Sequence, residues 1–141
     1  MRTKPTQTKR RKGQAIVESA LTIMVFLTML LGVLDFGQYL YFQQTLTERA
    51  RAAARYAVLD PTRVTAIKNI AMSNSPTSAT PALLPSLTAS MIAVTTADLG
   101  TPEGRVTVTI SNFPISFVTP GLAGSVKAPI VTVTYPSEAP W

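Results

Sequence analysis

Residues 11–34 read RKGQAIVESALTIMVFLTMLLGVL, and this stretch decides how the rest of the chain is organised. A basic cluster ends at Gly13, and in the apolar run from Ala15 to Leu34 the only charged residue is Glu18. A helix of about 20 residues rises about 30 Å, which is the thickness of the hydrocarbon core of a bilayer. The sequence therefore predicts a transmembrane helix from Ala15 to Leu34.

Two other kinds of apolar helix fit this run less well. A helix in the core of a soluble domain would need more surrounding chain than the remaining residues provide. A cleavable secretory signal has an apolar region of about 7–15 residues followed by small residues at the cleavage site. The sequence after the run, Asp35-Phe36-Gly37-Gln38-Tyr39, offers no such site.

The net charge of +6 belongs to the N-terminal tail. Six of the thirteen Lys and Arg residues precede Gly13 without any acid, and the other seven are balanced by seven acids. The tail has no aromatic residue to stack on bases, so we expect no nucleic-acid partner. Beside an apolar span, Arg10, Arg11 and Lys12 predict by the positive-inside rule that the N-terminus is cytoplasmic. The chain then passes the membrane once, and residues from about 36 onward lie outside the cytoplasm.

The helical pattern continues beyond the membrane. Residues 35–59 contain no proline and are rich in alanine, which favours a helix that packs closely against another element. Asp60-Pro61 then ends this helix and predicts a second one over 61–72, with Asp60 as its cap and Pro61 at its first position. Residues 74–86 contain three prolines and predict a loop.

The last third of the chain alternates with a period of two. Residues 105–111 and 130–135 predict clear strands and 91–96 a weaker strand. Residues 115–118 predict either a short fourth strand or a segment that lies over an edge of the sheet. These strands predict an antiparallel sheet whose apolar face is covered by the alanine-rich helix. The expected fold is α+β, with a long N-terminal transmembrane and amphipathic helix, a short second helix and a small sheet. Its expected parts are a basic leader (1–13), a transmembrane helix (14–34), an extracytoplasmic helix extension (35–59) and a small α+β domain (60–141).

The segment from Lys12 to Leu21, KGQAIVESAL, resembles the opening of TadE-like proteins, which are pseudopilins of tight-adherence (Flp) pilus systems with a type IV pilin-like N-terminus. Asp35-Phe36-Gly37 resembles the acid-x-Gly step of that family, and residues 44–55 resemble its Ala/Arg-rich segment. The segment Thr119-Pro120-Gly121-Leu122 resembles the C-terminal half of these proteins more loosely. The helix lacks the proline common near the start of such segments, which predicts a straighter helix, and Ser19 stands where an aromatic residue usually follows the acid.

The resemblance implies a pilin-like fold and a role as a minor pilin or pseudopilin. Such a subunit would lie in the bacterial inner membrane and act in a surface pilus used in adhesion. A prepilin peptidase would cut after Gly13, so that Gln14 becomes the first residue and Glu18 the fifth. Glu18 would then set the register between subunits by pairing with the free amine of a neighbouring Gln14. The implied partners are the inner membrane, the peptidase, other pilin and pseudopilin subunits and the pilus assembly machinery. Two simpler interpretations stay open, namely Glu18 reaching toward the headgroups and Gly13 as an ordinary helix breaker.

Two other classes of function remain for comparison. An enzyme would have to work without histidine or cysteine, and its only candidate acids beyond the helices are Asp98 and Glu103 beside a turn, together with Glu138. We therefore expect no catalysis, no metal and no cofactor. A membrane-anchored periplasmic binding module that never enters a filament shares the anchor and the sheet. Removal of residues 1–13 separates these hypotheses, because a simple anchor needs no processing.

Overall fold

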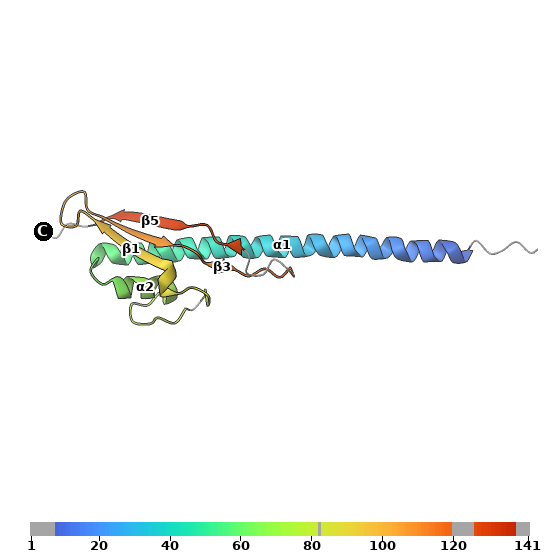
Figure 1. Ribbon diagram of the computed structural model, residues 1–141, viewed down its shortest axis with the longest axis horizontal. Helices are drawn as coiled ribbons and strands as arrows, with labels where there is room; N and C mark the ends of the chain where they lie inside the picture. Colours follow the sequence, from blue (N-terminus) through green and yellow to red (C-terminus); the bar gives the residue numbers. More distant parts are fainter. Residues whose placement is uncertain (1–7, 82, 120–125, 138–141) are drawn as a thin grey trace, which may run out of the picture.

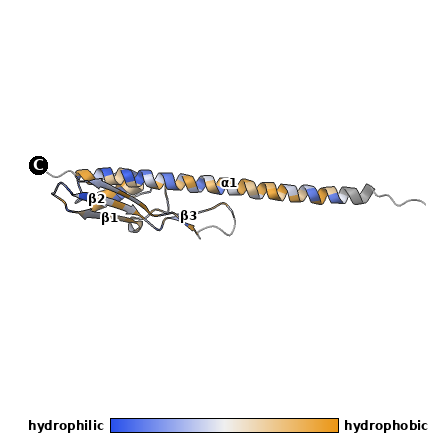
Figure 2. Cartoon of the chain, turned by 90° about the horizontal axis from the view of Figure 1, so that it is seen from above, coloured by the Kyte–Doolittle hydropathy of each residue, from blue (hydrophilic) through white to orange (hydrophobic). Residues whose placement is uncertain are grey.

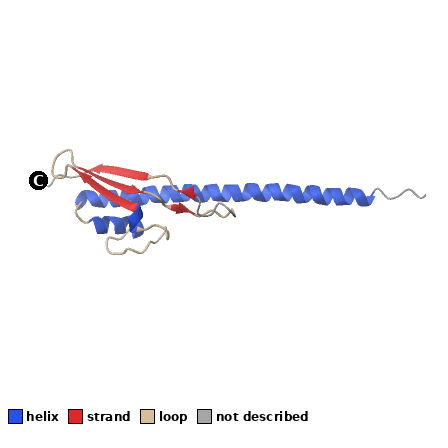
Figure 3. Cartoon of the chain, in the orientation of Figure 1, coloured by secondary structure: helices blue, strands red, loops and turns tan. Residues whose placement is uncertain are grey.

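The computed structural model describes residues 8–81, 83–119 and 126–137, with side chains from residue 13 onward. One long helix runs the length of the molecule, and a second helix and two small sheets pack against its C-terminal half (Figures 1 and 3). The α+β fold predicted from the sequence is confirmed. The described elements are α1 (Thr8–Leu59), α2 (Val64–Ser73), a 3-10 turn (Ala89–Met91), β1 (Ile92–Ala97), β2 (Arg105–Ile110), β3 (Pro114–Ile115), β4 (Val126–Lys127) and β5 (Val131–Pro136).

Helix α1 has 52 residues and is about 78 Å long at about 1.5 Å per residue. It begins at Thr8, so its first turns include residues that we expected to precede the helix, and it continues through Gly13. A single glycine costs about 1 kcal/mol relative to alanine inside a helix, and adding a residue to an existing helix is easy. Gly13 is therefore tolerated, and the helix runs on without a sharp bend (Figure 1).

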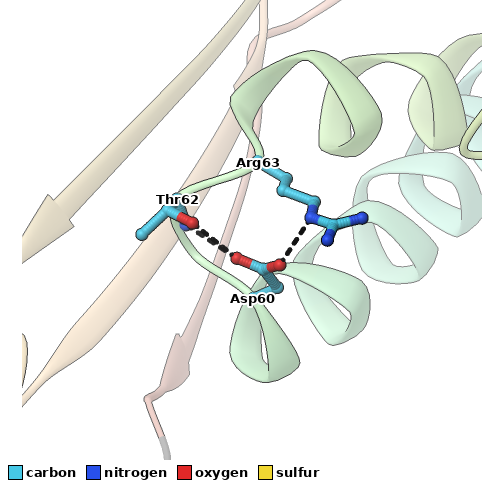
Figure 4. Close-up of polar contacts among 3 residues, drawn as sticks. All are labelled: Asp60, Thr62 and Arg63. Atoms are coloured by element: carbon cyan, nitrogen blue, oxygen red, sulfur yellow. Dashed lines mark hydrogen bonds and ion pairs between the residues drawn. The ribbon is translucent and has the colours of Figure 1, made fainter.

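The corner between the two helices differs from the prediction. Helix α2 begins at Val64, three residues later than expected, and Asp60 does not cap it. The Asp60 carboxylate instead accepts hydrogen bonds from the backbone N–H of Thr62 at 3.3 Å and from its hydroxyl at 2.7 Å, and pairs with Arg63 Nε at 2.9 Å (Figure 4). The side chain of Asp60 is therefore used in a tight turn, so Pro61 lies in the turn and not in the helix.

The larger sheet has the order β1-β2-β5, and both pairings are antiparallel. The central strand places Val108 opposite Val94 of β1 and opposite Val133 of β5. On the other face the strands carry threonines, and the hydroxyls of Thr107 and Thr134 lie 2.9 Å apart. One face of the sheet is therefore apolar and the other is polar, as the alternating sequence predicted.

The alanine-rich part of α1 covers the apolar face of this sheet. Four alanines of the helix and three residues of β2 are fully or almost fully buried: Ala50, Ala53, Ala54, Ala57, Val106, Val108 and Ile110. Helix α1 contacts α2, β2 and β5, and α2 contacts β1. Small side chains allow the helix axis to approach the sheet closely, so the C-terminal half of α1 forms part of the domain core.

Of the segment predicted at 115–118, only Ile115 lies in a strand, and that strand belongs to a separate small sheet. Pro114 and Ile115 of β3 pair antiparallel with Lys127 and Val126 of β4, a strand that the sequence did not predict. Ala128 follows β4 and donates its backbone N–H to the carbonyl of Phe113 at 2.8 Å. This small sheet lies beside α1, on the N-terminal side of the three-stranded sheet (Figure 1).

Candidate functional site

The part of α1 from residue 13 to residue 30 is mostly apolar and exposed. Every side chain from Gly13 to Leu30 is exposed, and Phe26, for example, retains 63% of its surface. Apolar residues gather along the middle of this helix, whereas polar and apolar residues alternate nearer its C-terminal end (Figure 2). Apolar surface of this extent is unfavourable in water. The exposed half therefore requires a hydrocarbon environment or other apolar helices.

The length and composition of α1 fit a single-pass membrane protein. It is the one helix among the described residues that is long and apolar enough to cross a membrane. The predicted span from Ala15 to Leu34 lies within the exposed half, and the first buried side chain after it is Asp35. Membrane span and domain core are thus consecutive parts of one continuous helix.

Gly13 and Gln14, the two residues of the predicted cleavage site, lie in helical backbone. A Cβ atom placed at Gly13 would meet nothing within 4 Å. Packing within this chain therefore does not require a glycine at this position. The nearby charges Arg10, Arg11 and Lys12 belong to the same helix, but their side chains lie outside the described residues, as do residues 1–7 of the predicted leader.

Glu18 is exposed on the free half of α1. Within the described part of the chain, no hydrogen bond or ion pair involves its carboxylate, and only its backbone carbonyl accepts a bond, from the hydroxyl of Thr22 at 2.9 Å. It lies about 6 Å from Gln14 and about 25 Å from Asp35 along the helix axis. Among the predicted site residues, Glu18 therefore lies close only to those near it on the same helix, such as Gln14.

Asp35 has a role that the sequence did not reveal. It follows the predicted span directly, it is 7% exposed, and its carboxylate holds a loop from the far end of the sequence. The backbone N–H groups of Val118 and Thr119 donate to it at 2.7 and 3.2 Å, and the hydroxyl of Thr119 donates to it as well. Asp35 therefore joins the end of the span to the loop after β3.

The electrostatic state of Asp35 follows from these bonds. The hydroxyl of Thr119 lowers the pKa of the Asp35 carboxyl below its ordinary value, and the backbone N–H groups of Val118 and Thr119 act in the same direction against the opposing effect of burial. A charged carboxylate accepts stronger hydrogen bonds than a neutral group. Asp35 is therefore ionised when it holds the loop.

The acids considered for catalysis lie in an exposed turn between β1 and β2. Asp98 and Glu103 are both exposed, and the backbone carbonyl of Asp98 accepts bonds from the N–H and hydroxyl of Thr101 at 3.2 and 2.7 Å. Glu138 lies outside the described residues. In the described part of the chain, no group of three or more His, Cys, Asp or Glu side chains is arranged to hold a metal ion.

The family of TadE-like proteins has a model that matches residues 13–55. The match begins at Gly13, includes Glu18 and Asp35, and ends within the alanine-rich part of α1. The resemblance inferred from the sequence is confirmed over these residues. No curated protein and no solved structure matches the chain.

Proposed function

We propose that the chain is a minor pilin or pseudopilin that acts in the assembly of a tight-adherence, type IV-like surface pilus, because residues 13–55 match the model of TadE-like proteins. The observation that carries the proposal is the division of α1 into an uncovered apolar half and a half that is built into the domain core. The hydrocarbon of a membrane and a bundle of apolar helices can each cover the apolar surface of this half. A subunit of this form can leave the membrane for a filament without unfolding its domain.

The proposal includes processing by a prepilin peptidase between Gly13 and Gln14. Cleavage of a helical bond requires the helix to unwind locally, and glycine makes this easier because it favours the helix less than other residues do. Packing gives no other reason for the glycine, since a Cβ at residue 13 meets nothing. Removal of residues 1–13 also removes six positive charges and leaves a mature chain with balanced charge.

Glu18 is the proposed register residue between subunits. An ionised acid in an apolar helix segment is costly, and in this structure its carboxylate has no partner among the described residues. After processing, the free amine of Gln14 on a neighbouring subunit offers an opposite charge. Pairing the two must offset the desolvation of both groups, so the pair contributes mainly to register and only modestly to net stability.

The proposed location follows from the charges on either side of the span. Six basic residues precede it, and the next basic residue in the sequence is Arg49. By the positive-inside rule the N-terminus lies in the cytoplasm, and the domain lies on the periplasmic side of the bacterial inner membrane. The partners are then the peptidase, other pilin and pseudopilin subunits and the assembly machinery. The chain acts by assembly and not by catalysis, in agreement with its lack of histidine and cysteine.

The experiment compares Glu18→Ala and the nearly isosteric Glu18→Gln with the parent, and uses Thr22→Ala as a matched control one turn further along the same exposed helix. Both Glu18 variants should insert into the membrane and lose residues 1–13, but cells that carry them should form fewer pili and attach less to surfaces. The control should resemble the parent. Equal numbers of pili for the parent and both Glu18 variants would reject the register role.

A second comparison separates the proposal from a membrane-anchored module that is never assembled. The Glu18 pair forms only after cleavage, so Glu18→Ala should add no further defect in a Gly13 variant that is not cut. A non-assembling module predicts no processing and no dependence of attachment on either residue. Full-length protein in membranes together with unchanged attachment would favour that module.

A further inference from the structure

Residues 116–119, which follow β3, lie beside the end of the membrane span, away from the main sheet. Figure 1 shows β3 alongside α1, on the side toward the N-terminus. The view from above, Figure 2, also places β3 beyond the sheet in this direction. The bonds from Val118 and Thr119 to Asp35 fix this position.

A groove between this loop and α1 extends into the span. Residues of α1 from Thr28 to Tyr39 form one wall, and Phe117 and Thr119 form the other. Thr28 lies about 10 Å on the N-terminal side of Asp35 along the helix. The predicted span ends at Leu34, so part of the groove lies at the depth of the hydrocarbon core. Its lining is mainly apolar and includes Leu31, Phe36 and Phe117.

The loop exposes an apolar side chain and directs two of its backbone N–H groups to α1. Val118 is 57% exposed, and Phe36 beside the loop on α1 is 63% exposed. The backbone N–H groups of Val118 and Thr119 both donate to Asp35. Non-helical backbone is tolerated at membrane depth only where its polar groups have partners within the protein. Asp35 supplies partners for these two N–H groups, so they do not need water.

We propose that the loop from Phe117 to Thr119 enters the bilayer leaflet nearest the domain and that the groove beside Asp35 is occupied by a lipid acyl chain. The groove is continuous with the membrane span, so acyl chains are the medium that already surrounds its wall. Asp35 is bonded to the loop, and the other lining groups are mainly apolar, which favours a hydrocarbon occupant over a polar one. The proposal rests on the membrane span and on the contacts between Asp35 and the loop, and it is independent of cleavage and pilus assembly.

The test uses fluorescence of the full chain in vesicles of phosphatidylethanolamine and phosphatidylglycerol. The chain has one tryptophan, Trp141, so Trp141→Phe provides a background in which a single new tryptophan reports its surroundings. Val118→Trp places the reporter on the loop at an exposed position. Leu99→Trp is the matched control, because Leu99 is 44% exposed and shares a groove with Leu59 at the opposite end of the domain.

The expected result is a loss of fluorescence of the loop tryptophan in vesicles that contain lipids brominated on their acyl chains, together with protection from the aqueous quencher acrylamide. The control tryptophan at residue 99 should be quenched by acrylamide and should keep its fluorescence in vesicles with brominated lipids. Quenching of both tryptophans by acrylamide alone would overturn the proposal. Protection of the loop tryptophan from both quenchers would also overturn it, because another protein surface would then cover the groove. Lipid quenching that persists in a chain that fails to form pili would separate this inference from the proposed function.

Discussion

Leu46→Ala tests whether α1 is both the membrane anchor and part of the domain core. Leu46 lies on α1 and is 1% exposed within the cluster that joins the helix to the sheet. Alanine is the best helix former, so the substitution leaves the helix itself intact and removes only the packing. Any loss of stability therefore reports the contact between helix and domain.

The size of the effect follows from the burial of this side chain. The substitution removes three carbon groups, and at about 0.8 kcal/mol for each buried group the lost transfer free energy is about 2.4 kcal/mol. The remaining cavity adds to this value, so we expect the free energy of unfolding to fall by about 3 kcal/mol. For a domain of roughly 100 residues, the melting temperature should decrease by at least about 10 °C.

The assay is thermal unfolding of the full chain in detergent micelles. Near-ultraviolet circular dichroism monitors the unfolding through Tyr56 and Tyr135, which pack against the core. Leu59→Ala is the matched control, because Leu59 ends the same helix and is 77% exposed. Its effect should stay within about 0.5 kcal/mol. Equal melting temperatures for the two variants would refute the conclusion that the helix forms part of the domain core.

Three further predictions follow from individual contacts. The Thr119 hydroxyl lowers the pKa of Asp35, so the stability that this carboxylate contributes is fully present above its ordinary pKa of 3.8 and is lost as the pH falls through the lowered pKa. The protection of the Thr119 amide from hydrogen exchange, taken relative to the intrinsic exchange rate at each pH, should therefore fall in acid, and Asp35→Asn should abolish that pH dependence. Gly104→Ala should destabilise the domain by about 1–3 kcal/mol, because the new Cβ would overlap Ser137 Oγ and approach backbone carbonyls, and urea unfolding would measure this. A reporter fused after Leu59 should be active only if it requires export, and activity of a cytoplasmic reporter at this point would overturn the proposed topology.

Much of the fold is readable from local patterns in the sequence. The apolar run is long enough to require a membrane, and strands β2 and β5 alternate clearly enough to show which face is buried. The closely spaced alanines of α1 indicate the face on which the sheet packs. Each of these features depends on residues near one another in the chain, which is why the sequence predicts them well.

The features that were missed depend on distant or competing contacts. Asp35 and Val118 are separated by 83 positions, and a carboxylate that binds backbone N–H groups leaves no pattern of side chains to detect. The short strand β4 exists only through its pairing with β3. At Asp60 two local roles compete, and bonds to Thr62 and Arg63 prevail over capping. The start of α1 was placed too late because Gly13 was treated as a breaker, although a long helix tolerates one glycine.

The intact mass of the protein recovered from membranes of cells that carry the peptidase tests the central claim most directly. We predict a mature chain that lacks residues 1–13 and begins at Gln14. Gly13→Val should retain the full-length mass and still fold, since a side chain at this position meets nothing within 4 Å. A full-length mass for the parent chain under these conditions would contradict the account.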